Sequence, residues 1–500
     1  MKKKRLAAAM LSAAILTTAC GTNAPSTAAS SVSAALETAG ADQEQIGGEI
    51  TVTCYDSVIY RTFLEEAAKL FEEQYPGTKV SIECFSEMPE IKTYEQDGAY
   101  ITAIVQEEDP QGRADYISKV STALMSGKGA DLLAMDVLPI HKYVESGQLE
   151  NLAEYMEQDP EFEPADYREN ILKAAAFNNG TWFMPLDYRF NYYTYDTTLI
   201  DGQQAAGFGA DKAFTAKQLV EIGRTVFDGD NKIMSAPAYL EAGGEDLFTQ
   251  MFNENYRHFV DLETKSANFT DGEFKTMIET VSELAAGGYI TKGIKMADNP
   301  EELMLSATES PTNRFVFKAK DNFSLIQETY PESGMNMMIT TSGAEAGIEA
   351  DDEIAGIRAD EDGIVPFTCE QAYGINSNSP NKVTAWAFLK FLLSYEIQAS
   401  PSLSLISLPV HNQARQDKAG SVYAMLLAEG GELDAIQTRG MEEYVGIVEA
   451  MSDQVNGHTI VDVMIRDMVM QEMNYFFDGT KTADDVCQVL QSKVELYLNE

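Results

Sequence analysis

The run Glu49-Ile50-Thr51-Val52-Thr53-Cys54-Tyr55 begins an alternation of strand and helix patterns. Its β-branched residues and short length predict a β-strand. From Tyr60 to Tyr75 large apolar residues recur every three or four positions, which predicts a helix with one buried stripe. The helix should end before Pro76-Gly77, and a second strand should follow at residues 79–85. Strand, helix and strand in this order predict a right-handed βαβ unit and hence a parallel sheet.

The same patterns continue further along the chain. Residues 131–136, Asp-Leu-Leu-Ala-Met-Asp, predict a third strand closed by Asp136. Because the carboxyl ends of strands face the ligand crevice in open α/β sheets, Asp136 is a candidate site residue, with the N-cap of the following helix as the alternative. We also expect a tight turn at Asn178-Asn179-Gly180. Three amphipathic helices are predicted at residues 214–227, 383–393 and 482–498.

Local signals are stronger in some segments than in others. Thr215 and Gln218 have the spacing of a capping box, which predicts where one helix begins. Residues 86–125 are polar with scattered aromatics, and we predict only a helix around residues 101–125. Residues 340–363 are acidic and glycine-rich with little periodicity, which predicts a loop.

The N-terminus has the pattern of an export signal. Residues 1–19 combine a basic start, a short apolar run and small residues, as in a secretory signal peptide. The sequence Leu16-Thr17-Thr18-Ala19-Cys20 resembles a bacterial lipobox, although Thr17 stands where leucine is usual. A lipobox implies that Cys20 is diacylated and becomes the new N-terminus, whereas the alternative is a fortuitous cysteine. Residues 21–46 have almost no large apolar side chains and predict a flexible tether.

Composition limits the kinds of partner. The chain has 500 residues, 44% of them hydrophobic and 23% charged, which is typical of a globular protein with more than one domain. Its formal net charge of -43 repels nucleic acid and anionic lipid headgroups. We therefore expect no nucleic-acid partner, and membrane attachment must come from something other than surface charge.

No pattern in the chain predicts catalysis or a cofactor. The sequence contains no HExxH, GxSxG, GxxxxGK[ST] or GxGxxG motif, and its four histidines lack zinc-ligand spacing. We therefore predict no catalytic residues, no metal and no cofactor. Cys54 and Cys84 end two predicted strands and could form a disulfide in an exported chain. Two buried free thiols are the favoured alternative because bridge geometry is demanding.

Several stretches follow one another in a recognisable order. The most specific is Ala372-Tyr373-Gly374-Ile375-Asn376-Ser377-Asn378-Ser379-Pro380-Asn381-Lys382, which runs into the helix at 385–392. The others are residues 71–80, 129–136, 147–152, 179–186, 191–196, 408–410 and 476–480. In order and spacing they resemble the family 1 extracellular solute-binding proteins, the group that includes the maltose-binding protein. Segments 86–125 and 340–363 look like additions to that family's pattern.

The resemblance implies an α/β protein with a two-lobe, periplasmic-binding-protein-like fold of type II, whose lobes are built from discontinuous segments around a hinge and an interlobe cleft. On this pattern residues 1–19 are the signal peptide and 20–47 the lipid-anchored tether. The first lobe comprises 48–188 and 311–376, and the second 189–310 and 377–500. The chain should cross between lobes near 187–190, 308–312 and 375–380. Closure about this hinge would enclose the solute.

The resemblance and the strand ends together suggest which side chains bind the solute. A sugar site needs aromatic faces and a few hydrogen-bonding charged groups, and with 23 tyrosines against 2 tryptophans we expect tyrosine to supply the stacking. Core packing or a structural ion pair is the alternative for several of the candidates. The candidates are Tyr55, Asp136, Asp187, Arg189, Tyr192, Glu370 and Tyr373.

These expectations amount to an exported, outward-facing lipoprotein held in the membrane by lipid on Cys20. It would be a monomer that captures a mono- or oligosaccharide and delivers it to the permease subunits of an ABC importer. One alternative is an exported glycan-active enzyme, which would need a fixed acid/base pair. Another is a surface sensor that uses the same fold without transport.

Overall fold

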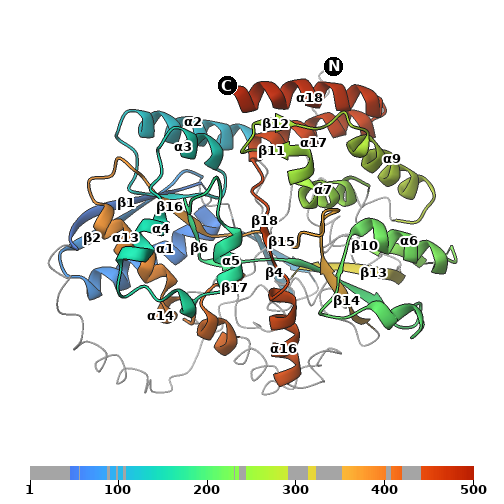
Figure 1. Ribbon diagram of the computed structural model, residues 1–500, viewed down its shortest axis with the longest axis horizontal. Coiled ribbons are helices and arrows are strands. Elements are labelled where there is room, and N and C mark those ends of the chain that lie inside the picture. The colour runs from blue at the N-terminus through green and yellow to red at the C-terminus, as the bar shows by residue number, and fades with distance from the viewer. Residues whose placement is uncertain are drawn as a thin grey trace.

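Two five-stranded sheets, each flanked by helices, form two lobes that lie side by side (Figure 1). The computed structural model describes residues 46–55, 57–86, 91–96, 99–104, 109–229, 231–235, 244–290, 314–321, 352–400, 407–418 and 441–500. The longer helices in these residues are α1 (Ser57–Gln74), α2 (Pro110–Met125), α6 (Ala216–Val226), α7 (Gly244–Glu254), α9 (Glu273–Ala286), α13 (Lys382–Leu393), α16 (Met441–Ser452), α17 (Val463–Phe477) and α18 (Ala483–Asn499). The shorter ones are α3 (Ile140–Glu145), α4 (Leu152–Gln158), α5 (Glu169–Ala174), α8 (Tyr256–Phe259) and α14 (Tyr395–Gln398). Within the described residues, no helix is long and apolar enough to cross a membrane.

The first lobe is built on the βαβ unit that the sequence predicts. Its sheet has the order β2-β1-β5-β16-β6, in which β1, β2 and β5 are parallel and β16 is antiparallel to its neighbours. Helix α1 packs against this sheet together with α13, where Phe71 and Phe388 meet at 5.1 Å between ring centroids. The strands are β1 (Gly48–Cys54), β2 (Thr78–Cys84), β5 (Leu132–Ala134), β6 (Met184–Pro185) and β16 (Ala372–Ile375).

The second lobe has its own sheet and its own core. The strand order is β10-β13-β8-β14-β9, and β8 runs antiparallel to both of its neighbours. Helices α6, α7, α9, α17 and α18 contribute the apolar side chains of this core. The strands are β8 (Asn191–Asp196), β9 (Ala213–Phe214), β10 (Asn231–Ser235), β13 (Arg314–Asp321) and β14 (Asp352–Arg358).

Three chain segments cross between the lobes side by side. Arg189 and Thr368 exchange backbone hydrogen bonds of 2.7 and 2.8 Å. On the other side of this middle segment, β15 (Pro366–Phe367) pairs in parallel with β18 (Gly457–His458). The lobes are therefore joined by a narrow, hydrogen-bonded ribbon of three linkers, which is the geometry of a hinge.

The predicted lobe boundaries are wrong at two places. Strands β13 and β14 lie in the second sheet, although residues 311–376 had been expected in the first lobe. Helix α13 packs on the first sheet, so the chain does not cross at 375–380 but stays in the first lobe after β16. In the structure the linkers lie around Arg189, after β14 and after α16, because strand pairing and helix packing keep these elements in their lobes. The crossing expected at 308–312 lies outside the described residues.

Two weakly patterned segments contain strands that were not expected. Residues 101–104 belong to the hairpin of β3 (Ile91–Gln96) and β4 (Ala99–Ile104), so the predicted helix begins only at Pro110. Residues 352–358, expected as a loop, form β14 and pair with β8 across a bulge. The remaining short pairs are β7 (Asp187–Tyr188) with β17 (Leu408–Pro409) and β11 (Val260–Asp261) with β12 (Ser266–Ala267).

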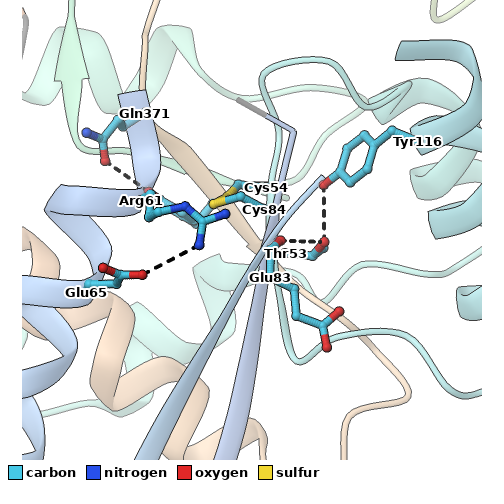
Figure 2. The surroundings of a disulfide bond; sticks show 9 residues. Thr53, Cys54, Arg61, Glu65, Glu83, Cys84, Tyr116 and Gln371 are labelled. Atoms are coloured by element: carbon cyan, nitrogen blue, oxygen red, sulfur yellow. Dashed lines mark hydrogen bonds and ion pairs between the residues drawn. A yellow bond between two sulfur atoms is a disulfide. The ribbon is translucent and has the colours of Figure 1, made fainter. Parts of the chain in front are cut away.

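Cys54 and Cys84 form a disulfide, so the prediction of two free thiols is wrong (Figure 2). They are directly opposed in the register of β1 and β2, with 4.7 Å between their Cα atoms. That separation falls within the range that a disulfide requires. Parallel pairing over the whole length of both strands thus supplies the geometry that the sequence spacing could not guarantee.

Candidate ligand cleft between the lobes

A cavity of about 490 Å³ lies where the two lobes meet the three linkers. This volume is within the range of small-molecule sites. The first lobe contributes residues 135, 136 and 138–141, after the end of β5, together with Phe183. The second lobe contributes the polar face of α7, and the linkers contribute residues 189–191, 366–369 and 458–463. Residues of both lobes and of all three linkers therefore line the cavity.

Aromatic rings surround the linker side of the cavity. The imidazole of His458 stacks on Phe367 with 4.5 Å between centroids, and Phe183 lies 5.4 Å away on another side. Phe190 completes the aromatic lining. No tyrosine or tryptophan occurs among the described residues that line the cavity, so phenylalanine and histidine supply the ring surfaces expected of tyrosine.

Two histidines in the lining are held neutral. Burial, together with the charges of Lys142 and Lys265, lowers the pKa of His141 to about 4. Burial likewise lowers the pKa of His458 to about 3. Each ring therefore offers one hydrogen-bond donor and one acceptor at neutral pH, without a charge.

A thiol and an imidazole also meet in the cleft, since Cys369 Sγ lies 3.7 Å from Nε2 of His458. Burial raises the pKa of the Cys369 thiol well above its usual value, and the charges of Asp187, Glu370 and Asp136 raise it further. A nucleophilic cysteine needs the opposite shift, towards a thiolate beside a protonated base. The environment of this pair therefore disfavours covalent chemistry.

Two of the residues proposed from the sequence line the cavity. Asp136 follows β5 at its carboxyl end and is half-buried in the lining. Arg189 comes from the first linker, and its guanidinium Nη1 lies 3.2 Å from Oε1 of Glu370. Glu370 is thus tied to the cleft through Arg189, although it is not among the described lining residues.

The other four candidates lie in the protein interior and not in the cavity lining. Tyr373 is fully buried and donates a 2.9 Å hydrogen bond to Gln371 Oε1. Tyr192 is buried in the first core, and Tyr55 packs between Phe85 and Tyr116. Strand pairing directs Tyr373 and Tyr192 into the interior, whereas Tyr55 follows the end of β1 and packs into the core of the first lobe.

Asp187 is the fourth of these residues. It is fully buried beneath the linkers, and its Oδ1 accepts hydrogen bonds from the backbone amides of Glu370 (2.9 Å) and Gln371 (3.2 Å). Burial, with the nearby Glu370 charge, raises the pKa of the Asp187 carboxyl to about 7. Its contacts join two of the three linkers.

Helix α7 supplies lining residues that sequence reasoning missed. Thr249, Gln250, Asn253 and Glu254 share one face of this helix and line the cavity. Their spacing was a usable signal, but the exposed face of any surface helix has the same pattern. Behind them, Glu254 pairs with the buried guanidinium of Arg358, which lies 5.2 Å above the ring of Tyr193.

Side chains with metal-binding chemistry occur together outside the cleft. Among the described residues, His258, Asp271 and Glu273 form the group whose ligand atoms all lie within 4.8 Å of one another. His258 Nε2 is 2.7 Å from Glu273 Oε2, and Asp271 Oδ1 accepts from the Glu273 amide at the start of α9. Glu273 is the first residue of α9 and Asp271 comes just before it, where acidic side chains are favourable without a metal.

Comparison with solved structures identifies the fold. An extracellular solute-binding protein family 1 structure from Alicyclobacillus acidocaldarius matches 91% of this chain and 99% of its own, with a TM-score of 0.53 and 16% identity. An ABC substrate-binding protein from Listeria monocytogenes, in complex with cycloalternan, matches 91% and 99%, with a TM-score of 0.54 and 14% identity. The sugar-binding protein MalE of Xanthomonas citri matches 90% of this chain and 98% of its own, with a TM-score of 0.53 and 14% identity. No protein-family model and no curated protein matches the sequence. The chain therefore has the two-lobe fold of these solute-binding proteins.

Proposed function

We propose that this chain is a solute-binding protein that encloses a small polar molecule between its lobes and delivers it to an ABC importer. The observation that carries the proposal is the cavity of about 490 Å³ over a hinge of three hydrogen-bonded linkers. A solute that touches both lobes would favour the closed state, because it gains contacts there that the open state lacks. Binding without covalent change is the expected activity.

A mono- or oligosaccharide is the solute class that we favour. Sugar rings stack on aromatic faces, which Phe183, Phe367 and His458 supply. Their hydroxyl groups suit the neutral histidines and the charged groups of Asp136 and Arg189 in the lining. The Listeria monocytogenes and Xanthomonas citri structures of the same fold are described as a cycloalternan complex and a sugar-binding protein, which is consistent with this choice.

The N-terminal sequence supports an exported, lipid-anchored monomer. We infer that residues 1–19 are a signal peptide and that Cys20 carries the lipid, palmitate included, with the tether of 20–47 leading to the lobes. The protein would face outwards from the cell membrane, where it could meet the permease subunits of the importer. Residues 1–45 lie outside the described residues, so this part of the proposal rests on sequence.

A thermal-shift screen of the full-length protein in mild detergent tests the function. The panel contains mono- and oligosaccharides, with sugar acids, amino acids and polyamines as controls. A ligand at about a hundred times its dissociation constant should stabilise the protein by roughly 2.7 kcal/mol, a shift of a few degrees. A saturable shift with one sugar class and no product formation supports the proposal. A shift with another solute class alone contradicts the sugar assignment, and steady consumption of the ligand contradicts the binding role.

A further inference from the structure

Several of the buried polar atoms without a hydrogen-bond partner lie in the cavity lining. In the part of the chain that the structure describes, such atoms include both ring nitrogens of His141, Oδ1 of Asn253, Nδ1 of His458 and Oγ1 of Thr459. All four residues line the cavity. His141 and Thr459 are only 4% and 6% exposed, so each is more than nine-tenths buried.

Neighbouring protein groups are already engaged elsewhere. The nearest acidic group to His141 is Asp462, whose Oδ2 lies 3.6 Å from Nδ1, too far for a hydrogen bond. Asp462 Oδ1 instead accepts from the amides of Met464 and Ile465, and Oδ2 accepts from the Tyr497 hydroxyl at 3.0 Å. The imidazole of His141 is thus not part of the network that begins α17.

Unpartnered buried polar groups reduce the stability of a protein, and native structures contain few of them. The members of this group that line the cavity would be satisfied if the cavity's occupant supplies the missing bonds. The chemistry of the set describes that occupant. Asn253 Oδ1 accepts, a neutral imidazole donates with one nitrogen and accepts with the other, and a threonine hydroxyl does both. A hydroxyl group is the complementary partner for every member.

Resting on the proposed function, we propose that His141, Asn253 and Thr459 are solute-contacting residues that recognise hydroxyl groups of an uncharged, polyhydroxylated molecule. His141 lies on α3 in the first lobe, Asn253 on α7 in the second, and Thr459 directly after β18 in a linker. A solute bonded to all three holds both lobes to the hinge. These residues therefore set specificity and couple binding to closure.

The test compares the stability of the solute-free protein with its affinity for saccharides, because the proposal predicts that only the affinity falls. Thr459→Val keeps the side-chain shape and removes an unpartnered hydroxyl, so the solute-free protein should keep or gain thermal stability. The same change should weaken saccharide binding by roughly tenfold, equivalent to about 1.4 kcal/mol. His141→Phe and Asn253→Leu should likewise keep the stability of the solute-free protein and weaken saccharide binding. Titration calorimetry with maltose, maltotriose and cyclic glucose oligosaccharides measures the affinity, and thermal unfolding of the solute-free full-length protein measures stability.

Thr194→Val is the matched control. Thr194 is also fully buried, but it lies on β8 in the second sheet and its Oγ1 donates to Asp352 Oδ2 at 3.4 Å. Its loss should lower the stability of the solute-free protein and leave saccharide affinity unchanged. Thr459→Val should show the reverse pattern.

The outcomes separate this inference from the function on which it rests. Wild-type binding that all three cleft variants leave unchanged would overturn the inference and keep the function. Loss of stability in each solute-free cleft variant would also overturn it, because the polar groups would then serve the fold. Failure of the wild type to bind any saccharide of the panel contradicts the proposed sugar cargo itself.

Discussion

Among single residues, Asp187 lies at a linker between the lobes but does not line the cavity. The sequence suggests a solute-contacting residue at a lobe crossing, whereas the structure buries its carboxyl beneath the linkers. There it organises the amides of Glu370 and Gln371, next to the cleft residue Arg189. Asp187 therefore acts on the hinge, where a charge is costly.

The raised pKa of Asp187 predicts a specific pH dependence of stability. Its folded-state value of about 7 exceeds the ordinary 3.8, so the folded protein retains a proton that the unfolded chain releases. The stabilisation from this group is complete below about pH 4 and is lost as pH rises to about 7. Asp187→Asn cannot ionise and should escape this loss, which amounts to ~4 kcal/mol at most. Urea unfolding of both proteins between pH 4 and 8 measures the difference.

All other titrating groups are shared by the two proteins, so the difference between their unfolding free energies isolates Asp187. That difference should move in favour of the variant as pH rises. Parallel curves for the two proteins would show that the carboxyl is not protonated in the folded state.

At the scale of elements, the first βαβ unit is closed by a covalent bond that its register makes feasible. The disulfide joins the ends of β1 and β2 over a sequence separation of 30 residues. Beside it, Thr53 contacts the hydroxyl of Tyr116 at 3.4 Å, which ties β1 to α2 (Figure 2). The end of β1 is therefore fixed from two sides.

Removing this bond should be costly. A closed loop of this length is worth ~3–4 kcal/mol, because the cross-link restricts the unfolded chain. The Cys54→Ala/Cys84→Ala double variant should lose about that much unfolding free energy in urea denaturation. Dithiothreitol should lower the wild type to a similar level and leave the variant unchanged. A wild-type midpoint that does not respond to the reductant would speak against the bond.

The start of α6 offers a second test at this scale. Thr215 Oγ1 accepts from the Gln218 amide at 3.2 Å, and Gln218 Oε1 accepts from the Thr215 amide at 2.9 Å, as the sequence predicts. Thr215→Ala should cost ~1 kcal/mol of unfolding free energy. Thr225→Ala, an exposed change near the end of the same helix, should stay within about 0.5 kcal/mol. Equal effects would mean that the cap does not begin the helix.

For the whole molecule, the net negative charge opposes attachment to a membrane. A net charge of -43 repels an anionic membrane surface, and within the described residues no helix could span a bilayer. Lipid on Cys20 would overcome this repulsion, because two acyl chains give stable anchoring.

The anchor is tested by Cys20→Ser. The variant should be absent from the membrane fraction and should incorporate no labelled palmitate. The wild type should remain in the membrane fraction and incorporate the label. Cell fractionation and metabolic labelling measure the two effects. Cys369→Ser, a change at a free cysteine far along the chain, is the control and should keep the membrane location. Retention of Cys20→Ser in the membrane would refute lipid anchoring at this residue.

A residue's place at the cleft can be predicted from the sequence when the residue follows the end of a strand. Asp136 could be predicted because a parallel strand delivers its last residue to the crevice. Tyr373 could not, since it lies on a strand that pairs with both β5 and β6, and its exposure depends on both neighbours. Thr459 carries no local signal, and the helical spacing that includes Asn253 cannot be told from the exposed face of any surface helix.

Local sequence is enough to predict the elements whose causes lie within a few residues. These include the β1-α1-β2 unit, the turn at Asn178-Asn179, whose φ values are positive, and the capping box that begins α6. Periodicity, turn chemistry and capping act over one or two helical turns, so the local sequence contains them. Local sequence could not predict the lobe to which β13, β14 and α13 belong, the pairing of the linkers or the lining of the cleft. These depend on contacts such as Arg189 with Thr368, which distant parts of the chain make only when the whole core packs.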